Sequence, residues 1–206
     1  MRKSITAGVN RRYQKIRKRG RLKYRLLTTS LRKLPEFLII GTQKGGTTSL
    51  HAYLDQHPML IMSSHKEPHF FTFAYDRGIN YYKHYFPYRW QNQLSGEATP
   101  AYFCHPDVPA RVHAMLPAAK LILLLRNPVE RAFSAHQMNL RKGWETEADF
   151  EKVVDREFDW LNDSKNYRVN GDIHYDDFFH NHIYLAKGRY GSYLGQWLKY
   201  FGRQQI

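Results

Sequence analysis

The residues best suited to chemistry lie in the stretch EFLIIGTQKGGTTS, residues 36–49. Lys44 supplies a positive charge, two glycines follow it and let the backbone approach a ligand closely, and Thr47 and Thr48 add hydroxyl donors. The stretch leads from an apolar run into a helical pattern, and the free N–H groups and dipole of a helix's first turn favour an anion. This spacing predicts a binding site for phosphate or sulfate.

The order of residues in this loop differs from that of a Walker A loop. The pattern GxxxxGK[ST] needs its lysine directly after the second glycine, whereas here Lys44 precedes the glycines and Thr47 stands at that position. A P-loop kinase is therefore the weaker enzyme alternative, and the sequence offers no clear magnesium-binding partner for one. A glycine-rich turn without a ligand is the other alternative that the loop alone leaves open.

A second stretch, LILLLRNPVERAFSAH at residues 121–136, repeats this arrangement. An apolar run leads to Arg126, Pro128 suits the first turn of a helix, and Ser134 follows about two helical turns after the arginine. Ligands of open α/β sheets bind at the carboxyl ends of the strands. Two basic, hydroxyl-bearing strand ends predict a ligand with two separate anionic groups. The alternative for Arg126 is an ordinary surface ion pair.

Apolar runs and helical patterns must position these two loops. Short apolar runs predict strands at 37–40, 60–62, 94–99 and 120–125. Helical spacing predicts helices at 47–56, 79–86, 106–115, 128–141, 147–158 and 181–201, with a loop at 159–180. Strands that alternate with helices predict an α/β domain with a mainly parallel sheet.

Composition limits the class of protein. The chain of 206 residues, 42% of them hydrophobic, is long enough for one sizeable core. No segment approaches the ~20 apolar residues of a membrane-spanning helix, and no signal-peptide pattern opens the chain. Cys104 is the only cysteine, which excludes an internal disulfide and a cysteine-based metal cluster. This favours a reducing compartment, so we expect a cytoplasmic protein.

The net charge of +14 is concentrated at the amino terminus. Residues 1–33 hold 13 of the 32 Lys and Arg residues and no Asp or Glu, which leaves the rest of the chain nearly neutral. A flexible, basic arm over 1–34 is the simplest interpretation. Contact with an anionic membrane surface, a nucleic acid or another polyanion is the functional alternative, and an Arg-rich transit peptide is a further one.

The two loop segments together carry a resemblance to a known family. PEFLIIGTQKGGTTSL and AKLILLLRNPVERAFSAHQ are similar to the sulfotransferases that use 3′-phosphoadenosine 5′-phosphosulfate (PAPS), especially the carbohydrate-acting, heparan-sulfate-type and bacterial branch. Three further stretches agree: KEPHFF at 66–71, GEATPAYF at 96–103 and KGRYGSYLGQWLKYF at 187–201. The resemblance implies a P-loop-NTPase-like three-layer domain over residues 35–206.

The resemblance implies a role for each loop residue. The first loop resembles the one that binds the 5′-phosphosulfate, with Lys44 as the catalytic lysine. The implied phosphate ligands are Lys44, Gly45, Gly46, Thr47, Thr48 and Ser49. Arg126 and Ser134 match the pair that holds the 3′-phosphate, and Tyr190 belongs to a stretch near the nucleotide. PAPS is thus the implied co-substrate, and no metal is implied.

Glu67, in KEPHFF, matches the carboxylate that acts as general base in heparan-type members. The acceptor hydroxyl or amine must lose a proton as it attacks, so a carboxylate within hydrogen-bond reach suits the reaction. His65 and His69 are competing bases, because other sulfotransferases use a histidine there. The alternative for Glu67 is a surface carboxylate paired with Lys66. The implied acceptor is a carbohydrate, either a poly- or an oligosaccharide.

The sequence departs from the family pattern at two places. Ala98 follows Glu97, where heparan-type members often carry a lysine, and this bears on the acceptor rather than on PAPS binding. The chain also ends at FGRQQI, where the family continues into another strand, another helix and a basic loop over the adenine. From the resemblance we therefore expect a domain that is incomplete at its carboxyl terminus.

Overall fold

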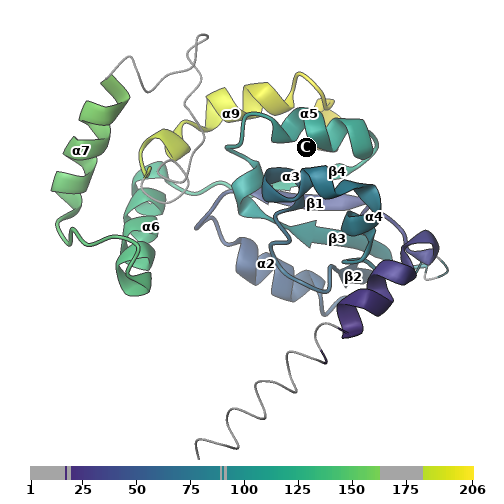
Figure 1. Ribbon diagram of the computed structural model, residues 1–206. Helices are drawn as coiled ribbons and strands as arrows, with labels where there is room; N and C mark the ends of the chain where they lie inside the picture. Colours follow the sequence, from purple (N-terminus) through teal and green to yellow (C-terminus); the bar gives the residue numbers. More distant parts are fainter. Residues whose placement is uncertain (1–16, 18–19, 89, 91, 163–182) are drawn as a thin grey trace, which may run out of the picture.

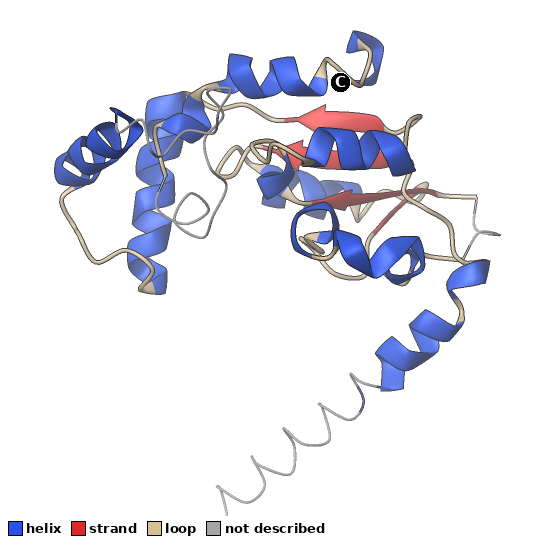
Figure 2. Ribbon diagram, turned by 45° about the horizontal axis from the view of Figure 1, so that its top comes forward, coloured by secondary structure: helices blue, strands red, loops and turns tan. Residues whose placement is uncertain are grey.

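The computed structural model describes residues 17, 20–88, 90, 92–162 and 183–206 (Figures 1 and 2). The described strands form one four-stranded sheet in the order β2-β3-β1-β4, and every neighbouring pair is parallel. The strands are β1 (Phe37–Gly41), β2 (Leu60–Met62), β3 (Leu94–Ala98) and β4 (Lys120–Leu123). The prediction of an α/β domain with a parallel sheet is confirmed.

Side chains alternate along β1 and divide the core between the two faces of the sheet. Phe37 and Ile39 pack on one face, together with leucines of α2 (Thr47–Leu54). Leu38 and Ile40 pack on the other face. The helices that supply this second layer are α3 (Phe70–Phe73), α4 (Gly78–Lys83), α5 (Val108–Met115) and α9 (Tyr190–Trp197) (Figure 1). The sheet therefore lies between two helical layers, as predicted.

Aromatic residues that precede β3 belong to this second layer. Phe70, Phe71, Tyr82 and Phe86 are fully buried. The rings of Phe70 and Tyr82 stack with their centroids 4.3 Å apart. Large buried rings contribute strongly to core stability, so these four side chains serve packing rather than ligand binding.

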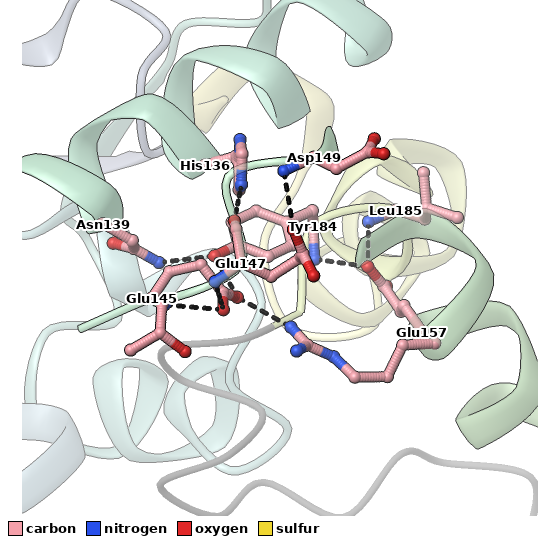
Figure 3. A network of polar contacts seen from close by, with 10 residues as sticks. His136, Asn139, Glu145, Glu147, Asp149, Glu157, Tyr184 and Leu185 are labelled. Atoms are coloured by element: carbon pink, nitrogen blue, oxygen red, sulfur yellow. Dashed lines mark hydrogen bonds and ion pairs between the residues drawn. The ribbon is translucent and has the colours of Figure 1, made fainter. Parts of the chain in front are cut away.

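The helix expected over 181–201 is interrupted. The chain forms a 3₁₀ turn, η5 (Ala186–Gly188), before α9 begins. Glu157 on α7 (Phe150–Asn162) is buried and accepts hydrogen bonds of 2.7 to 2.8 Å from the backbone N–H groups of residues 184–186 (Figure 3). Because a side chain holds these N–H groups, the chain enters α9 later than its apolar spacing predicts.

Both ends of α7 differ from the prediction. The helix was expected over 147–158, but it begins at Phe150 and continues to Asn162. Glu147 accepts a hydrogen bond from the N–H of Asp149, and Asp149 accepts one from the N–H of Glu151 in the first turn, which favours the later start. Most of the loop predicted at 159–180 lies outside the described residues.

The residues just before β1 contact the body of the domain. Residues 20–27 are helical, and the 3₁₀ turn η1 (Thr29–Leu31) follows them. Arg32 is buried and donates to the carbonyl oxygen of Phe86 at 2.7 Å. For the described residues this differs from the flexible arm expected over 1–34. Within the part of the chain that the structure describes, no helix has the length and apolarity needed to cross a membrane.

Candidate active site

A pocket of about 390 Å³ lies where β1 and β4 end and where α2 and α6 (Pro128–Lys142) begin. The predicted site residues of the two loops that line it are Lys44, Gly46, Thr47, Thr48, Arg126 and Ser134, and Gln43 of the first loop lines it as well. Gly45, Ser49 and Tyr190 are not among its lining residues. The fold therefore brings both predicted anion-binding loops to one pocket at the carboxyl ends of neighbouring strands.

Backbone geometry shapes the first loop. Lys44 has a φ of +68°, and Gly46, which caps the start of α2, has a φ of +99°. Left-handed backbone of this kind costs glycine little. Gly45 has a different role, because a Cβ there would lie 2.7 Å from the carbonyl oxygen of Leu124. Gly45 thus allows the first loop to pack against the second, while Gly46 faces the pocket.

A helix cap and a tyrosine fix the second loop. The side-chain oxygen of Asn127 accepts hydrogen bonds from the N–H groups of Val129 and Glu130, and it caps the start of α6. The Tyr190 hydroxyl donates to the carbonyl oxygen of Arg126 at 2.9 Å. Tyr190 therefore holds the backbone beside the pocket. The Arg126 side chain also pairs with Glu130 at 3.1 Å, an exposed contact of the kind that contributes little.

The pocket carries an excess of positive charge. Burial lowers the pKa of Lys44, and the positive charges of Arg141, Lys142 and Arg126 lower it further. The ion pairs formed among the described residues involve neither Lys44 nor Lys142. An anionic ligand would relieve this repulsion between like charges, which agrees with the predicted phosphate or sulfate site.

Glu67 and His69 also line the pocket. Their φ angles are +55° and +52°, and such strained backbone is found preferentially at functional sites. The ammonium of Lys66 donates to a carboxylate oxygen of Glu67 at 2.7 Å and to the hydroxyl of Thr48 at 3.0 Å. The expected pair of Lys66 and Glu67 is therefore present, and Lys66 also links the candidate base to the first loop through Thr48, a contact that the sequence did not reveal.

The charge state of Glu67 follows from these neighbours. His69 and then Lys66 lower the pKa of Glu67 to about 2, although partial burial acts in the opposite direction. The carboxylate is therefore ionised at neutral pH. His69 Nε2 lies 3.7 Å from Glu67, which is an ion-pair distance and longer than the contact with Lys66. His65, the other competing base, is not among the lining residues, and its ring stacks beside Tyr85.

Three further lining residues come from the end of α6 and the turn after it. Met138, Lys142 and Trp144 were not predicted as site residues. The Lys142 ammonium lies 4.1 Å from the centroid of the Trp144 ring, a cation–π distance. Gly143, with a φ of +69°, ends the helix and redirects the chain. Gly143 is the signal in the sequence that marks the end of the helix. The place of Trp144 in the pocket depends on tertiary packing, so no signal in the sequence pointed to it.

Glu97 illustrates a carboxylate with a structural role. It is fully buried on β3 and accepts hydrogen bonds of 2.6 to 2.9 Å from Tyr82, Thr99 and Tyr102. Burial raises its pKa, and the three hydroxyl donors oppose that effect. Glu97 does not line the pocket. Among the described residues, no group of three or more His, Cys, Asp or Glu side chains is arranged to hold a metal ion.

Comparison with known proteins defines the class to which this fold and pocket belong. The model of the family described as "Sulfotransferase domain" matches residues 34–206, which is most of the chain. The chain therefore belongs to the sulfotransferase family, and the resemblance noted from its motifs is confirmed.

Individual relatives agree with this assignment. Human heparan sulfate glucosamine 3-O-sulfotransferase 6 is 42% identical over 111 residues, 54% of this chain and 32% of that protein. The membrane-associated sulfotransferase kil1 of Dictyostelium discoideum is 42% identical over 134 residues, 61% of this chain and 28% of that protein. The chain thus matches about a third of the length of these curated relatives.

A solved structure supports the fold. The crystal structure of a sulfotransferase from Alicyclobacillus acidocaldarius superposes with a TM-score of 0.65 at 30% sequence identity. The match covers 84% of this chain and 72% of that one. The arrangement of strands and helices is therefore shared with a sulfotransferase along most of the chain.

Proposed function

We propose that this protein transfers a sulfuryl group from PAPS to a hydroxyl or amine of a carbohydrate. The observation that carries the proposal is the meeting of two anion-binding loops and one ionised carboxylate in a single pocket. Membership of the sulfotransferase family supports PAPS as the co-substrate. The heparan sulfate in the name of the human relative supports a saccharide as the acceptor.

The pocket residues fit the two anionic ends of PAPS, which would supply the sulfuryl group. Gly46, Thr47 and Thr48, at the start of α2, offer N–H and hydroxyl donors to the 5′-phosphosulfate. Arg126 and Ser134 offer a separate charge and hydroxyl to the 3′-phosphate. We assign Gly45, Ser49 and Tyr190 to shaping these loops, because none of them lines the pocket.

We assign Lys44 to the leaving phosphate. Negative charge develops on the bridging oxygen as the bond to sulfur breaks, and a protonated amine beside it stabilises the transition state more than the ground state. The surrounding positive charges make binding of an anion favourable even before the reaction. Lys44 therefore serves catalysis more than affinity.

We assign Glu67 as the base that takes the proton of the acceptor. With a pKa of about 2 its carboxylate is a weak base in the free protein. Lys66 contacts both Glu67 and Thr48, so an anion bound at the first loop competes with Glu67 for that ammonium. Withdrawal of Lys66 raises the pKa of Glu67. Co-substrate binding would thereby strengthen the base at the moment when it is needed.

The acceptor side of the pocket comprises Met138, Lys142 and Trp144. A half-exposed indole ring offers a flat apolar surface to a sugar ring. Lys142, on the same side, offers a charge to an acidic group of the saccharide. We therefore propose an oligo- or polysaccharide that carries acidic groups as the acceptor class.

Calorimetry with 3′-phosphoadenosine 5′-phosphate, ADP and ATP tests the co-substrate. We expect the 3′-phosphorylated nucleotide to bind roughly 10- to 100-fold more tightly than ADP, because Arg126 and Ser134 would add charge-assisted hydrogen bonds to its 3′-phosphate. Equal affinity for ADP would contradict the proposal and favour a P-loop kinase. Transfer of labelled sulfate from PAPS to acidic and to neutral oligosaccharides tests the acceptor class.

We also propose a cytoplasmic location with peripheral contact to a membrane. The free, buried Cys104 is compatible with a reducing compartment. The name of the Dictyostelium relative supports membrane contact. Fractionation of cells that express the chain checks the proposal, and recovery within a secretory or organellar lumen would contradict it.

A further inference from the structure

Polar contacts attach a basic helix to the start of the domain. The helix comprises residues 20–27 and continues into η1. Arg25 donates to the carbonyl oxygens of His84 and Phe86, and Arg32 also donates to that of Phe86. These bonds fix the position of the helix on the domain, and they do so through its arginines rather than through its leucines.

The apolar side chains of this helix face solvent. The exposed ones are Leu22, Tyr24, Leu26, Leu27 and Leu31. Leu27 is 74% exposed. The domain core does not cover these side chains, so the described part of the helix has an apolar face ready for a partner.

An aromatic pair continues the exposed surface. The hydroxyl groups of Tyr24 and Tyr88 lie 2.8 Å apart, and the Tyr88 ring stacks on Trp90 at 4.4 Å. Trp90 is 64% exposed. Tryptophan and tyrosine are enriched where a bilayer meets water. The leucine–tryptophan surface, as we call it, consists of Leu22, Tyr24, Leu26, Leu27, Leu31 and Trp90.

The charged residues of this helix have one sign. Arg21 and Lys23 are exposed on the same helix, and residues 1–33 contain 13 basic and no acidic side chains. A nucleic acid or a soluble polyanion would bind the cations and leave the leucines in water. A neutral apolar partner would cover the leucines and leave the cations unmatched. An anionic lipid surface satisfies both kinds of side chain at once.

We propose that the leucine–tryptophan surface docks the protein on an anionic membrane. The leucines and Trp90 enter the boundary between headgroups and acyl chains, and the basic side chains contact the headgroups. None of these residues lines the pocket. The inference rests on the peripheral membrane contact proposed above and specifies its surface, but it is independent of the proposed sulfotransferase reaction, so docking and reaction can fail separately.

Co-sedimentation of the full chain with lipid vesicles tests the proposal. We expect binding to phosphatidylcholine vesicles that contain about one third phosphatidylserine, weakening as salt screens the charges, and little binding to pure phosphatidylcholine. The variant Leu22→Ser/Leu26→Ser/Leu27→Ser should bind about tenfold more weakly or worse. Arg21→Gln and Lys23→Gln should each weaken binding roughly fivefold.

Phe158→Ser is the matched control, because Phe158 is 60% exposed on α7, far from the basic helix (Figure 1). It should bind vesicles as the wild type does, and all variants should keep the wild-type melting temperature. Undiminished binding by the triple leucine variant, or equal binding to both kinds of vesicle, overturns the proposal. The proposal is also overturned if the protein binds heparin but not vesicles. It is overturned as well if the protein forms a dimer that dissociates only when the leucines are changed, because the surface would then be a dimer interface.

Discussion

The two halves of the pocket are held in place by different means. In the half proposed to bind the nucleotide, Thr48 and Arg126 follow the ends of two hydrogen-bonded strands and lie at the starts of two helices. In the half proposed to bind the acceptor, Glu67 sits in a turn with positive φ, and Trp144 follows the glycine that ends α6. We call them the nucleotide half and the acceptor half. The sheet constrains the first half much more tightly than turns constrain the second. Under the proposed function, co-substrate binding is thus tied to the fold, while acceptor choice is free to vary.

The largest expected effect falls on the acceptor half. Glu67→Gln keeps the shape of the side chain but removes its capacity to take a proton, so turnover should fall by about 10²–10⁴. Affinity for 3′-phosphoadenosine 5′-phosphate, measured by calorimetry, should stay close to that of the wild type. If Glu67→Gln is mild and His69→Ala is severe, the histidine is the base and this half has been misread.

A smaller loss of turnover should follow from Lys44→Ala in the nucleotide half. Removal of one donor aimed at developing charge costs roughly 10²–10³ in rate, while much of the nucleotide affinity should remain. Lys142→Ala is the control from the acceptor half, and it should raise KM for an acidic acceptor with little change in kcat. Transfer at the wild-type rate by Lys44→Ala would make Lys44 merely a loop residue.

Nucleotide affinity should respond to Arg126→Ala. Loss of a charge-assisted hydrogen bond to the 3′-phosphate should weaken binding of 3′-phosphoadenosine 5′-phosphate roughly 10- to 100-fold and leave ADP binding unchanged. Glu130→Gln removes the ion pair of Arg126 without removing the arginine, so its affinity should match or exceed that of the wild type. An equal loss for both nucleotides would show that Arg126 does not read the 3′-phosphate.

The smallest effect is a shift in pH dependence. The wild-type Glu67 has a pKa of about 2, below its ordinary value of 4.5, so kcat/KM should show no loss from its protonation between pH 7 and about pH 4. Lys66→Gln removes one of the two groups that lower that pKa and leaves His69 in place, so its kcat/KM should begin to fall at a higher pH than that of the wild type. Identical profiles would contradict the link through Lys66.

The same charges affect stability in a defined direction. Because the pKa of Glu67 is depressed in the folded protein, its ion pairs stabilise the fold above the ordinary pKa, and this contribution is lost as pH falls from 4.5 toward 2. The contribution is small, since the carboxylate is more than a third exposed. The melting temperatures of the wild type and Lys66→Gln should therefore differ slightly above pH 5 and converge as the pH falls toward 2.

The strands and the meeting of the two loops could be predicted because local signals agree there. Apolar runs end in Gly41 or lead to Arg126, and each is followed by helix-start residues. Glu67 was found only through a motif resemblance, and no signal pointed to Trp144, since it reaches the pocket only when α6 packs beside the first loop. The break before α9 was hidden for a similar reason, because Glu157 is remote in sequence from the N–H groups that it holds. Local patterns do not encode contacts between distant segments.

The basic helix and the pocket lie at opposite ends of β1. The chain passes from the helix into the start of this strand and leaves its end through the first loop. Five extended residues span about 16 Å, so in the proposed docked state the strand would separate the bilayer from the proposed reaction. A lipid headgroup in that bilayer would then be too far away to enter the pocket, whereas a long glycan in the surrounding water could reach it. Docking would in this way select acceptors by their length as well as by their chemistry.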